Sequence, residues 1–248
     1  PIIKIKYSLD NLLTKLDQPN KFRWVVAAHT IMTTDTIAKM SCSTFKINGK
    51  DVNIAGIAKG SGMIFPNMGT MLGFIFTDAN ISSTLLNSFL QNKVENTFNA
   101  ISVDGDTSTN DMVLLFATNK AKHNIIKSKN SKEAQIFQKH LEEVMLNLAK
   151  QVAMDGEGAK KFITINITNC KNKKLSKKIA FSIANSPLVK TAIAAEDPNW
   201  GRILMAVGKV DEKINKDKVS LKIGNYLIFK DGEIAKNYNE LKVKEYMS

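Results

Sequence analysis

The spacing of apolar residues along the chain changes between the period of helices and that of strands. Apolar residues three or four positions apart predict helices at 8–16, 85–94, 137–152 and 179–184. Alternating or continuous apolar runs between turn residues predict strands at 43–47, 52–57, 71–76, 112–117, 162–167, 219–223 and 226–229. Asn-Gly at 48–49 and Gly-Asn at 224–225 predict hairpins. The pattern therefore predicts a mixed α/β fold.

One polar and basic segment, 120–132, predicts a long loop or a subdomain boundary. No internal repeat or low-complexity tract divides the chain elsewhere. We therefore expect residues 1–248 to form a single functional region.

Composition places the chain among globular proteins, since 44% of its 248 residues are hydrophobic and 23% are charged. Its apolar runs are much shorter than the roughly 18 residues of a membrane helix, so we expect no membrane association. Cys42 and Cys170 are far apart, and the three histidines are scattered without metal-ligand spacing. We therefore expect a cytoplasmic protein with no metal and no resident cofactor.

The net charge of +12 raises the alternative of a basic nucleic-acid-binding module. Only Arg23 and Arg202 are arginines, however, and arginine is the residue best suited to specific phosphate and guanine recognition. The tightest lysine cluster, 171–178, contains no aromatic residue on which a base could stack. The charge therefore favours a solvated lysine surface, and we expect no nucleic-acid partner.

A threonine nucleophile is the remaining chemical candidate. Thr70 follows the small residue Gly69 and precedes the predicted buried strand 71–76. If the chain is cut before Thr70, the new α-amine has a pKa of about 7.7–8.0 and can serve as the base for its own hydroxyl. A glycine followed by a threonine before a strand is also common in ordinary turns, so this pattern alone is weak.

Five segments of the chain, in order, resemble the glutamate N-acetyltransferase/ornithine acetyltransferase family of arginine biosynthesis. They are 31–36, 59–72, 103–111, 155–159 and 195–202. The resemblance implies a layered α/β/β/α sandwich similar to that of the self-processing DmpA-like aminopeptidases. It also implies a precursor that cuts itself into 1–69 and 70–248, with the pieces assembled as an α2β2 heterotetramer.

The activity implied by the resemblance is acetyl transfer from N-acetylornithine to glutamate through an acetyl-Thr70 intermediate. Some family members also accept acetyl-CoA as co-substrate. The alternative within the same chemistry is a DmpA-like amidohydrolase or aminopeptidase, which would deliver the acyl group to water.

The resemblance assigns substrate contacts to Thr33, Lys59, Thr70 and Glu196. A lysine can hold a substrate carboxylate, and a glutamate can pair with the ammonium of ornithine. The structural alternatives are a surface lysine at 59 and, for Glu196, an ion pair with Arg202. Other polar residues of these segments are candidates for a structural hydroxyl or for bracing the site: Thr34, Thr36, Asp35, Asp104, Asp106 and Asn110.

The chain departs from the family pattern in three ways. Gly69 stands where alanine is usual, and Phe65 stands where a polar residue is frequent. The family's oxyanion-hole segment and its C-terminal substrate-binding segment find no counterpart here. We therefore interpret the chain as an internal fragment, truncated at both ends. Losing one oxyanion donor costs roughly 10²–10³ in rate, so we expect this chain to have weak or no turnover.

Overall fold

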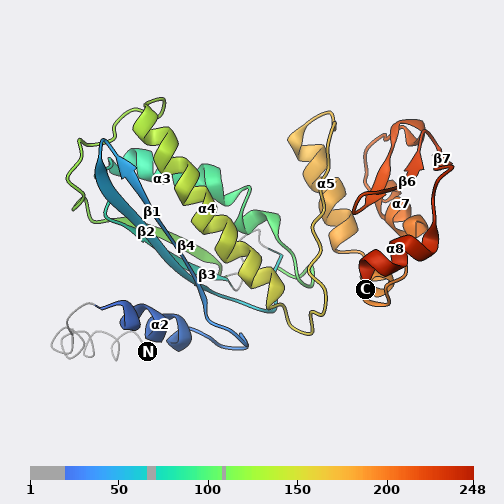
Figure 1. Cartoon of the computed structure of the whole chain (residues 1–248), viewed down its shortest axis with the longest axis horizontal. Coiled ribbons are helices and arrows are strands. Elements are labelled where there is room, and N and C mark those ends of the chain that lie inside the picture. The colour runs from blue at the N-terminus through green and yellow to red at the C-terminus, as the bar shows by residue number, and fades with distance from the viewer. Residues whose placement is uncertain (1–19, 66–70, 108–109) are drawn as a thin grey trace.

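A four-stranded sheet is the centre of the N-terminal unit in the computed structural model, which describes residues 20–65, 71–107 and 110–248 (Figure 1). Its strands, in the spatial order β1-β2-β3-β4, are β1 (Lys39–Ile47), β2 (Lys50–Lys59), β3 (Leu72–Thr77) and β4 (Met112–Ala117). β1, β2 and β3 pair antiparallel, whereas β3 and β4 pair parallel. The Asn-Gly hairpin predicted at 48–49 is confirmed, because Ile47 pairs with Lys50 across it.

One face of this sheet is covered by α4 (Lys132–Met154), with α3 (Ser83–Val94) and the short η1 (Phe98–Ala100) alongside (Figure 1). The apolar stripe predicted for 137–152 is the buried face of α4, and Ser131 caps the helix by accepting a hydrogen bond from the amide of Ala134 at 3.1 Å. The helix packs so closely that a Cβ on Gly56 of β2 would lie 2.8 Å from Leu148. This close approach explains the glycine at position 56.

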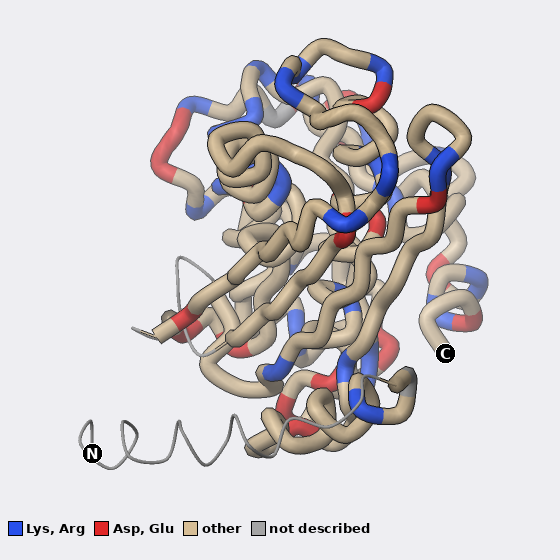
Figure 2. Tube along the Cα trace, turned by 90° about the vertical axis from the view of Figure 1, so that its left-hand side faces the viewer, with Lys and Arg blue, Asp and Glu red and all other residues tan. Residues whose placement is uncertain are grey.

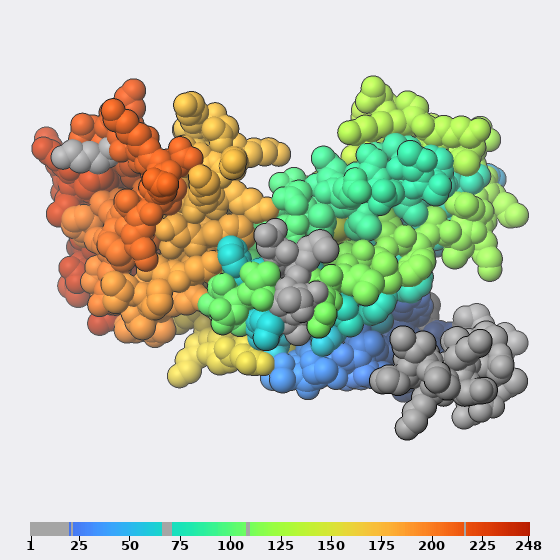
Figure 3. Space-filling view, turned by 180° about the vertical axis from the view of Figure 1, so that it is seen from behind, coloured from blue at the N-terminus to red at the C-terminus, as the bar shows by residue number. Residues whose placement is uncertain are grey.

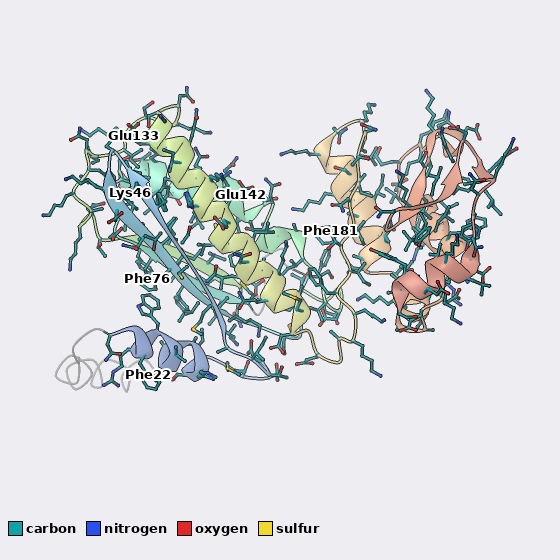
Figure 4. The ribbon with its side chains drawn as sticks, viewed as in Figure 1. Phe22, Lys46, Phe76, Glu133, Glu142 and Phe181 are labelled. Atoms are coloured by element: carbon teal, nitrogen blue, oxygen red, sulfur yellow. The ribbon has the colours of Figure 1, made fainter. Side chains whose placement is uncertain are left out.

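The other face of the sheet carries α2 (Lys21–Thr30) near its centre. Trp24 of α2 meets Phe76 of β3 edge to face, with ring centroids 5.4 Å apart, and Phe76 points toward α2 (Figure 4). Phe76 also stacks on Phe116 of β4 at 5.0 Å. Aromatic contacts of this kind stabilise the packing beyond the area they bury, so they hold α2 on the sheet.

The C-terminal unit has a separate small core around Ile179, Ile183, Val189 and Ala206. Its elements are α5 (Lys173–Ala184), α6 (Pro187–Ala194), α7 (Trp200–Gly208), η2 (Lys216–Lys218), β5 (Leu221–Ile223), β6 (Tyr226–Lys230), β7 (Glu233–Ile234) and α8 (Glu240–Met247). The three strands form their own sheet, and Figure 1 shows it at the opposite end of the molecule from the first. In the described residues the two sheets therefore belong to different units and do not stack face to face.

The two units meet beside the segment that follows β2. Phe65 packs edge to face on Phe181 of α5, with centroids 4.8 Å apart, and Lys190 of α6 donates a hydrogen bond to the carbonyl of Val103. Val103, Phe181 and Lys190 also line a cleft of about 1360 Å³ between α3–α4 and α5–α6, and the notch between the units is visible from behind (Figure 3).

Of the two interpretations of segment 120–132, the structure favours the long loop. The segment lies in the connection from β4 to α4, which pack in the same core, and the residues of the second core lie beyond Val152. The strand predicted at 162–167 is not formed, although Ile165 and Ile167 do pack on the C-terminal core. A strand needs a hydrogen-bonded neighbour, and no described strand pairs with this segment. The helix predicted at 8–16 lies outside the described residues.

Charged residues of both signs are interspersed over the chain (Figure 2). Within the 171–178 lysine cluster, Lys177 pairs with Glu95 and Lys178 with Glu212, each at 2.9 Å. The cluster is thus partly neutralised by neighbouring carboxylates. None of the described helices is long and apolar enough to cross a membrane.

Candidate active site

Two of the substrate contacts expected from the sequence come together at the end of β2. Lys59 is the last residue of that strand, and its Nζ donates a hydrogen bond to Oγ1 of Thr33 at 3.3 Å. The contact follows from the hairpin, because antiparallel pairing of Ala58 with Lys39 returns the end of β2 to the loop that precedes β1. An ammonium and a hydroxyl are therefore side by side, and both can donate to a ligand carboxylate.

Asp35 fixes the backbone on both sides of this pair. Its Oδ1 accepts a hydrogen bond from the amide of Gly60 at 2.6 Å, and its Oδ2 accepts one from the amide of Thr33 at 3.1 Å. The side chain is buried, with 8% of the residue exposed. Asp35 therefore ties the loop that carries Thr33 to the residue that follows Lys59.

A buried lysine links Asp35 to the end of α4. Lys39 is fully buried, and its Nζ lies 2.6 Å from a carboxylate oxygen of Asp35 and 2.6 Å from one of Asp155. Asp155 follows the last turn of α4 and also accepts the amide of Thr36 at 2.9 Å. We call Asp35, Lys39 and Asp155 the buried triad. It joins the loop before β1, the end of β2 and the end of α4.

The two carboxyl groups of the triad have lowered pKa values. Burial alone would raise the pKa of Asp155, but the hydrogen bond from Lys39 and those from Thr36 outweigh it and lower the pKa from 3.8 to about 2. For Asp35, burial is likewise outweighed by the hydrogen bonds from Lys39, Gly60 and Thr33, so its pKa also falls below 3.8. Both groups are ionised at neutral pH.

The triad predicts a specific loss of stability in acid. A carboxyl group whose pKa is lower in the folded than in the unfolded chain adds stability above its unfolded value of 3.8, and that stability disappears as the pH falls toward about 2. Urea unfolding midpoints should therefore fall more steeply below pH 4 in the wild type than in Asp155→Asn, which lacks one titrating group. Parallel pH curves for the two proteins would contradict the assignment.

The segment after β2 brings a second carboxylate to this place. Ser61 shares a hydrogen bond with the hydroxyl of Thr34, 2.9 Å between oxygens, and its carbonyl accepts the amide of Glu157 at 2.9 Å. A Cβ on Gly62 would lie 2.6 Å from the carboxyl carbon of Glu157, so the end of that side chain lies against the backbone of Gly62. Glu157 therefore lies against residues 61–62, two and three positions after Lys59.

Glu196 has different partners. It lies between α6 and α7, where its carboxylate accepts hydrogen bonds from Nζ of Lys161 at 2.8 Å and from Oγ of Ser248 at 3.1 Å. These bonds lower its pKa below the ordinary value. The alternative pairing with Arg202 is wrong, because that guanidinium donates to the carbonyl of Leu188 and to Thr191. Among the described residues, none of the contacts of Glu196 reaches Thr33 or Lys59.

Thr70, the expected nucleophile, lies outside the described residues, as does Gly69. The residue after it is firmly placed: Met71 is 2% exposed, donates its amide to Asp111 and accepts the amide of Met112 at 3.0 Å. Leu72 then pairs with Lys59 across β2 and β3. The chain therefore enters β3 directly beside Lys59.

Asp104 braces the other end of the intervening segment. Its two carboxylate oxygens accept the amides of Met63 at 2.6 Å and Ile64 at 3.1 Å, and the amide of Asp106 at 3.0 Å. Asp35 and Asp104 thus hold opposite ends of 60–64. In the described ranges, no three His, Cys, Asp or Glu side chains converge as metal ligands.

Comparison with known proteins gives a consistent result. A model described as the ArgJ family matches residues 1–248. The arginine biosynthesis bifunctional protein ArgJ of Bradyrhizobium diazoefficiens is 48% identical over 227 residues, which are 90% of this chain and 55% of that protein. The protein of the same name from Zymomonas mobilis is 44% identical over 245 residues, which are 99% of this chain and 60% of that protein. The chain thus spans little more than half the length of these curated relatives.

A solved structure shares the fold. The crystal structure of the arginine biosynthesis bifunctional protein argJ from Bacillus halodurans superposes with a TM-score of 0.69 at 39% identity, covering 72% of this chain and 83% of that one. The predicted mixed α/β fold class is confirmed by this likeness.

Proposed function

Because the chain belongs to the ArgJ family, we propose that the protein of which it is part transfers an acetyl group from N-acetylornithine to glutamate. The acetyl group is carried on Thr70 after the chain is cut between Gly69 and Thr70. The products are ornithine and N-acetylglutamate, and acetyl-CoA is a further candidate donor. We also propose a cytoplasmic α2β2 assembly of the two pieces.

The observation that carries the proposal is the Thr33–Lys59 pair at the start of β3. Lys59 donates to Thr33 at 3.3 Å and pairs in register with Leu72, two residues after the expected nucleophile. A carboxylate held by Lys59 would therefore bind close to the first residue of β3, which follows Thr70 by two positions in the sequence. Both N-acetylornithine and glutamate have such a carboxylate, so one site can serve both half-reactions.

The chemistry requires two exchanges at one carbonyl. The hydroxyl of Thr70 attacks the acetyl carbon of N-acetylornithine, its proton passes through the α-amine, and the carbon–nitrogen bond breaks to release ornithine. The neutral α-amine of glutamate then attacks the acetyl ester, the carbon–oxygen bond breaks, and Thr70 regains its proton. An attacking water in place of glutamate would make the protein a hydrolase.

A carboxylate must also hold the side-chain ammonium of ornithine, and two glutamates compete for this role. The family resemblance assigns Glu196, but its carboxylate is occupied by Lys161 and Ser248. Glu157 contacts Gly62, in the segment that follows Lys59. Its position favours Glu157 as the group that binds the ammonium.

The proposed function predicts a clear difference between Glu157→Gln and Glu196→Gln. Because turnover by this chain is expected to be slow, the measurement is formation of the acetyl-enzyme from N-acetylornithine, followed by intact mass. Glu157→Gln should slow acetylation at low substrate about 10- to 100-fold, the loss of one charged hydrogen bond. Glu196→Gln, the matched control, should stay within about twofold because an exposed ion pair contributes little.

Discharge of the acetyl-enzyme then tests the reaction class. Glutamate should accelerate loss of the acetyl group and yield N-acetylglutamate. Free acetate formed at the same rate with or without glutamate would establish the hydrolase instead. A large loss in Glu196→Gln with none in Glu157→Gln would return the ammonium contact to Glu196.

A further inference from the structure

We propose that the buried triad Asp35–Lys39–Asp155 is a positioning device that sets the two ends of the substrate site relative to each other. The identity of the substrates that this site binds rests on the proposed function. Asp35 is the arm that positions Thr33 and Lys59, and Asp155 is the arm that positions Glu157. Lys39 is the shared ammonium that joins the arms.

The Asp35 arm acts through backbone amides. Its two oxygens accept hydrogen bonds from the amides of Gly60 and Thr33. Nζ of Lys39 lies 2.6 Å from one of these oxygens and holds the carboxylate in place. Lys59 immediately precedes Gly60, so the direction in which its side chain leaves β2 depends on that amide. Asp35 therefore sets the 3.3 Å contact between Lys59 and Thr33 through the backbone, by binding the amides of Gly60 and Thr33.

The Asp155 arm acts through the end of α4. Asp155 accepts Nζ of Lys39 and the amide of Thr36, so it holds the last residues of the helix against the loop before β1. Glu157 follows two residues later, with its amide bound to the carbonyl of Ser61. The same helix end thus fixes both the triad and the proposed ammonium-binding carboxylate.

The charge balance of the triad argues for a role beyond stability. Two carboxylates share one ammonium, so the buried group carries a net charge of −1 at neutral pH. Burying ions is costly, and apolar side chains of similar volume often stabilise a core equally well or better. What apolar side chains cannot supply is a pair of acceptors that holds the amides of Thr33 and Gly60 in one geometry.

The test uses Asp35→Asn in the 248-residue chain, with Asp78→Asn as the matched control. Asp35→Asn leaves Lys39 and Asp155 as a balanced pair, so the fold should be retained. Asp78 also accepts a backbone amide, that of Asn53 at 2.8 Å, but at the other end of β2. The readouts are amide hydrogen exchange at Thr33 and Gly60, and the KM and maximal rate of acetylation by N-acetylornithine.

In Asp35→Asn we expect the amides of Thr33 and Gly60 to exchange about tenfold faster or more, since each loses a charged acceptor worth roughly 1.5 kcal/mol or more. The KM for N-acetylornithine should rise about tenfold, with a smaller change in maximal rate. A merely destabilised variant would lose active protein, and so maximal rate, at an unchanged KM. Asp35→Glu, which keeps the charge, should recover part of the affinity.

The outcomes separate the two proposals. If the wild type is acetylated but Asp35→Asn matches Asp78→Asn in exchange and in KM, the triad is not a positioning device and the proposed function stands. If the wild type is never acetylated, the proposed function fails for this chain alone, and the same acetylation measurement on the full-length protein decides it. Amide exchange then still tests whether Asp35 positions Thr33 and Gly60. Unchanged protection of these two amides in Asp35→Asn would overturn the positioning role of the triad.

Discussion

Lys39→Met is expected to lower the free energy of unfolding by about 3–5 kcal/mol, the cost of breaking a buried ion pair by removing one partner. The substitution keeps a long side chain but leaves two carboxylates in a site that excludes water. Lys39 is fully buried and lies 2.6 Å from each carboxylate, so no solvent replaces its charge. Because domains are stable by only about 5–15 kcal/mol, the loss should be visible as a large fall in the urea midpoint.

The matched control is Lys46→Met on the same strand. Lys46 lies 3.7 Å from Asp51, and both side chains are about 70% exposed, so the change should stay within about 1 kcal/mol (Figure 4). The acid response adds a second check. Without Lys39, burial is expected to raise the pKa values of Asp35 and Asp155, so the deficit of Lys39→Met should shrink as the pH falls. A similar, small effect of both substitutions would show that the triad is not a buried charge cluster.

The sequence predicted the elements whose periodicity spans several turns or a full strand. Segment 137–152 predicted α4 because its apolar residues repeat over four turns, and the runs 71–76 and 112–117 predicted β3 and β4 within a residue. α2 was not predicted, since its apolar side chains are divided between the sheet and solvent. The strand expected at 162–167 failed because alternation indicates which residues can form a strand but not whether a neighbour is present.

The candidate site was predicted in part. Thr33 and Lys59 were found through the family resemblance, and their contact depends on the hairpin that the sequence also predicted. The triad was missed because Lys39 and Asp155 are 116 residues apart, and only the packing of α4 on β1 joins them. Glu157 was part of a matching segment but was given no role; the available signal was an acidic residue three positions after the end of the longest helix.

The second large effect concerns Thr70. The wild-type chain is expected to give two masses on denaturing analysis, one ending at Gly69 and one beginning at Thr70, whereas Thr70→Ala should remain a single uncut chain. In the cut, the hydroxyl of Thr70 attacks the carbonyl of Gly69, the peptide nitrogen becomes the leaving amine, and water then hydrolyses the ester. The alanine variant has no oxygen to begin this sequence, so the loss should be complete.

Two controls make the interpretation specific. Thr70→Ser keeps a hydroxyl and should still be cut, whereas a structural role for the threonine methyl group would not be restored by serine. Thr107→Ala removes a hydroxyl that donates to the carbonyl of Phe65 at 3.1 Å and should leave cleavage unchanged. Cleavage of Thr70→Ala would assign the cut to another nucleophile.

An uncut wild type would have a different meaning, because self-cleavage requires the scissile carbonyl to be held against the hydroxyl. Met71 is fixed by Asp111 and Met112, and the segment before the cut is held at Gly60 by Asp35 and at Met63 by Asp104. If these anchors position the bond, this 248-residue chain is sufficient and the masses will show two pieces. A single mass would place a necessary part of the machinery in the remaining length of the family's proteins, and the catalytic proposal for this chain alone would be withdrawn.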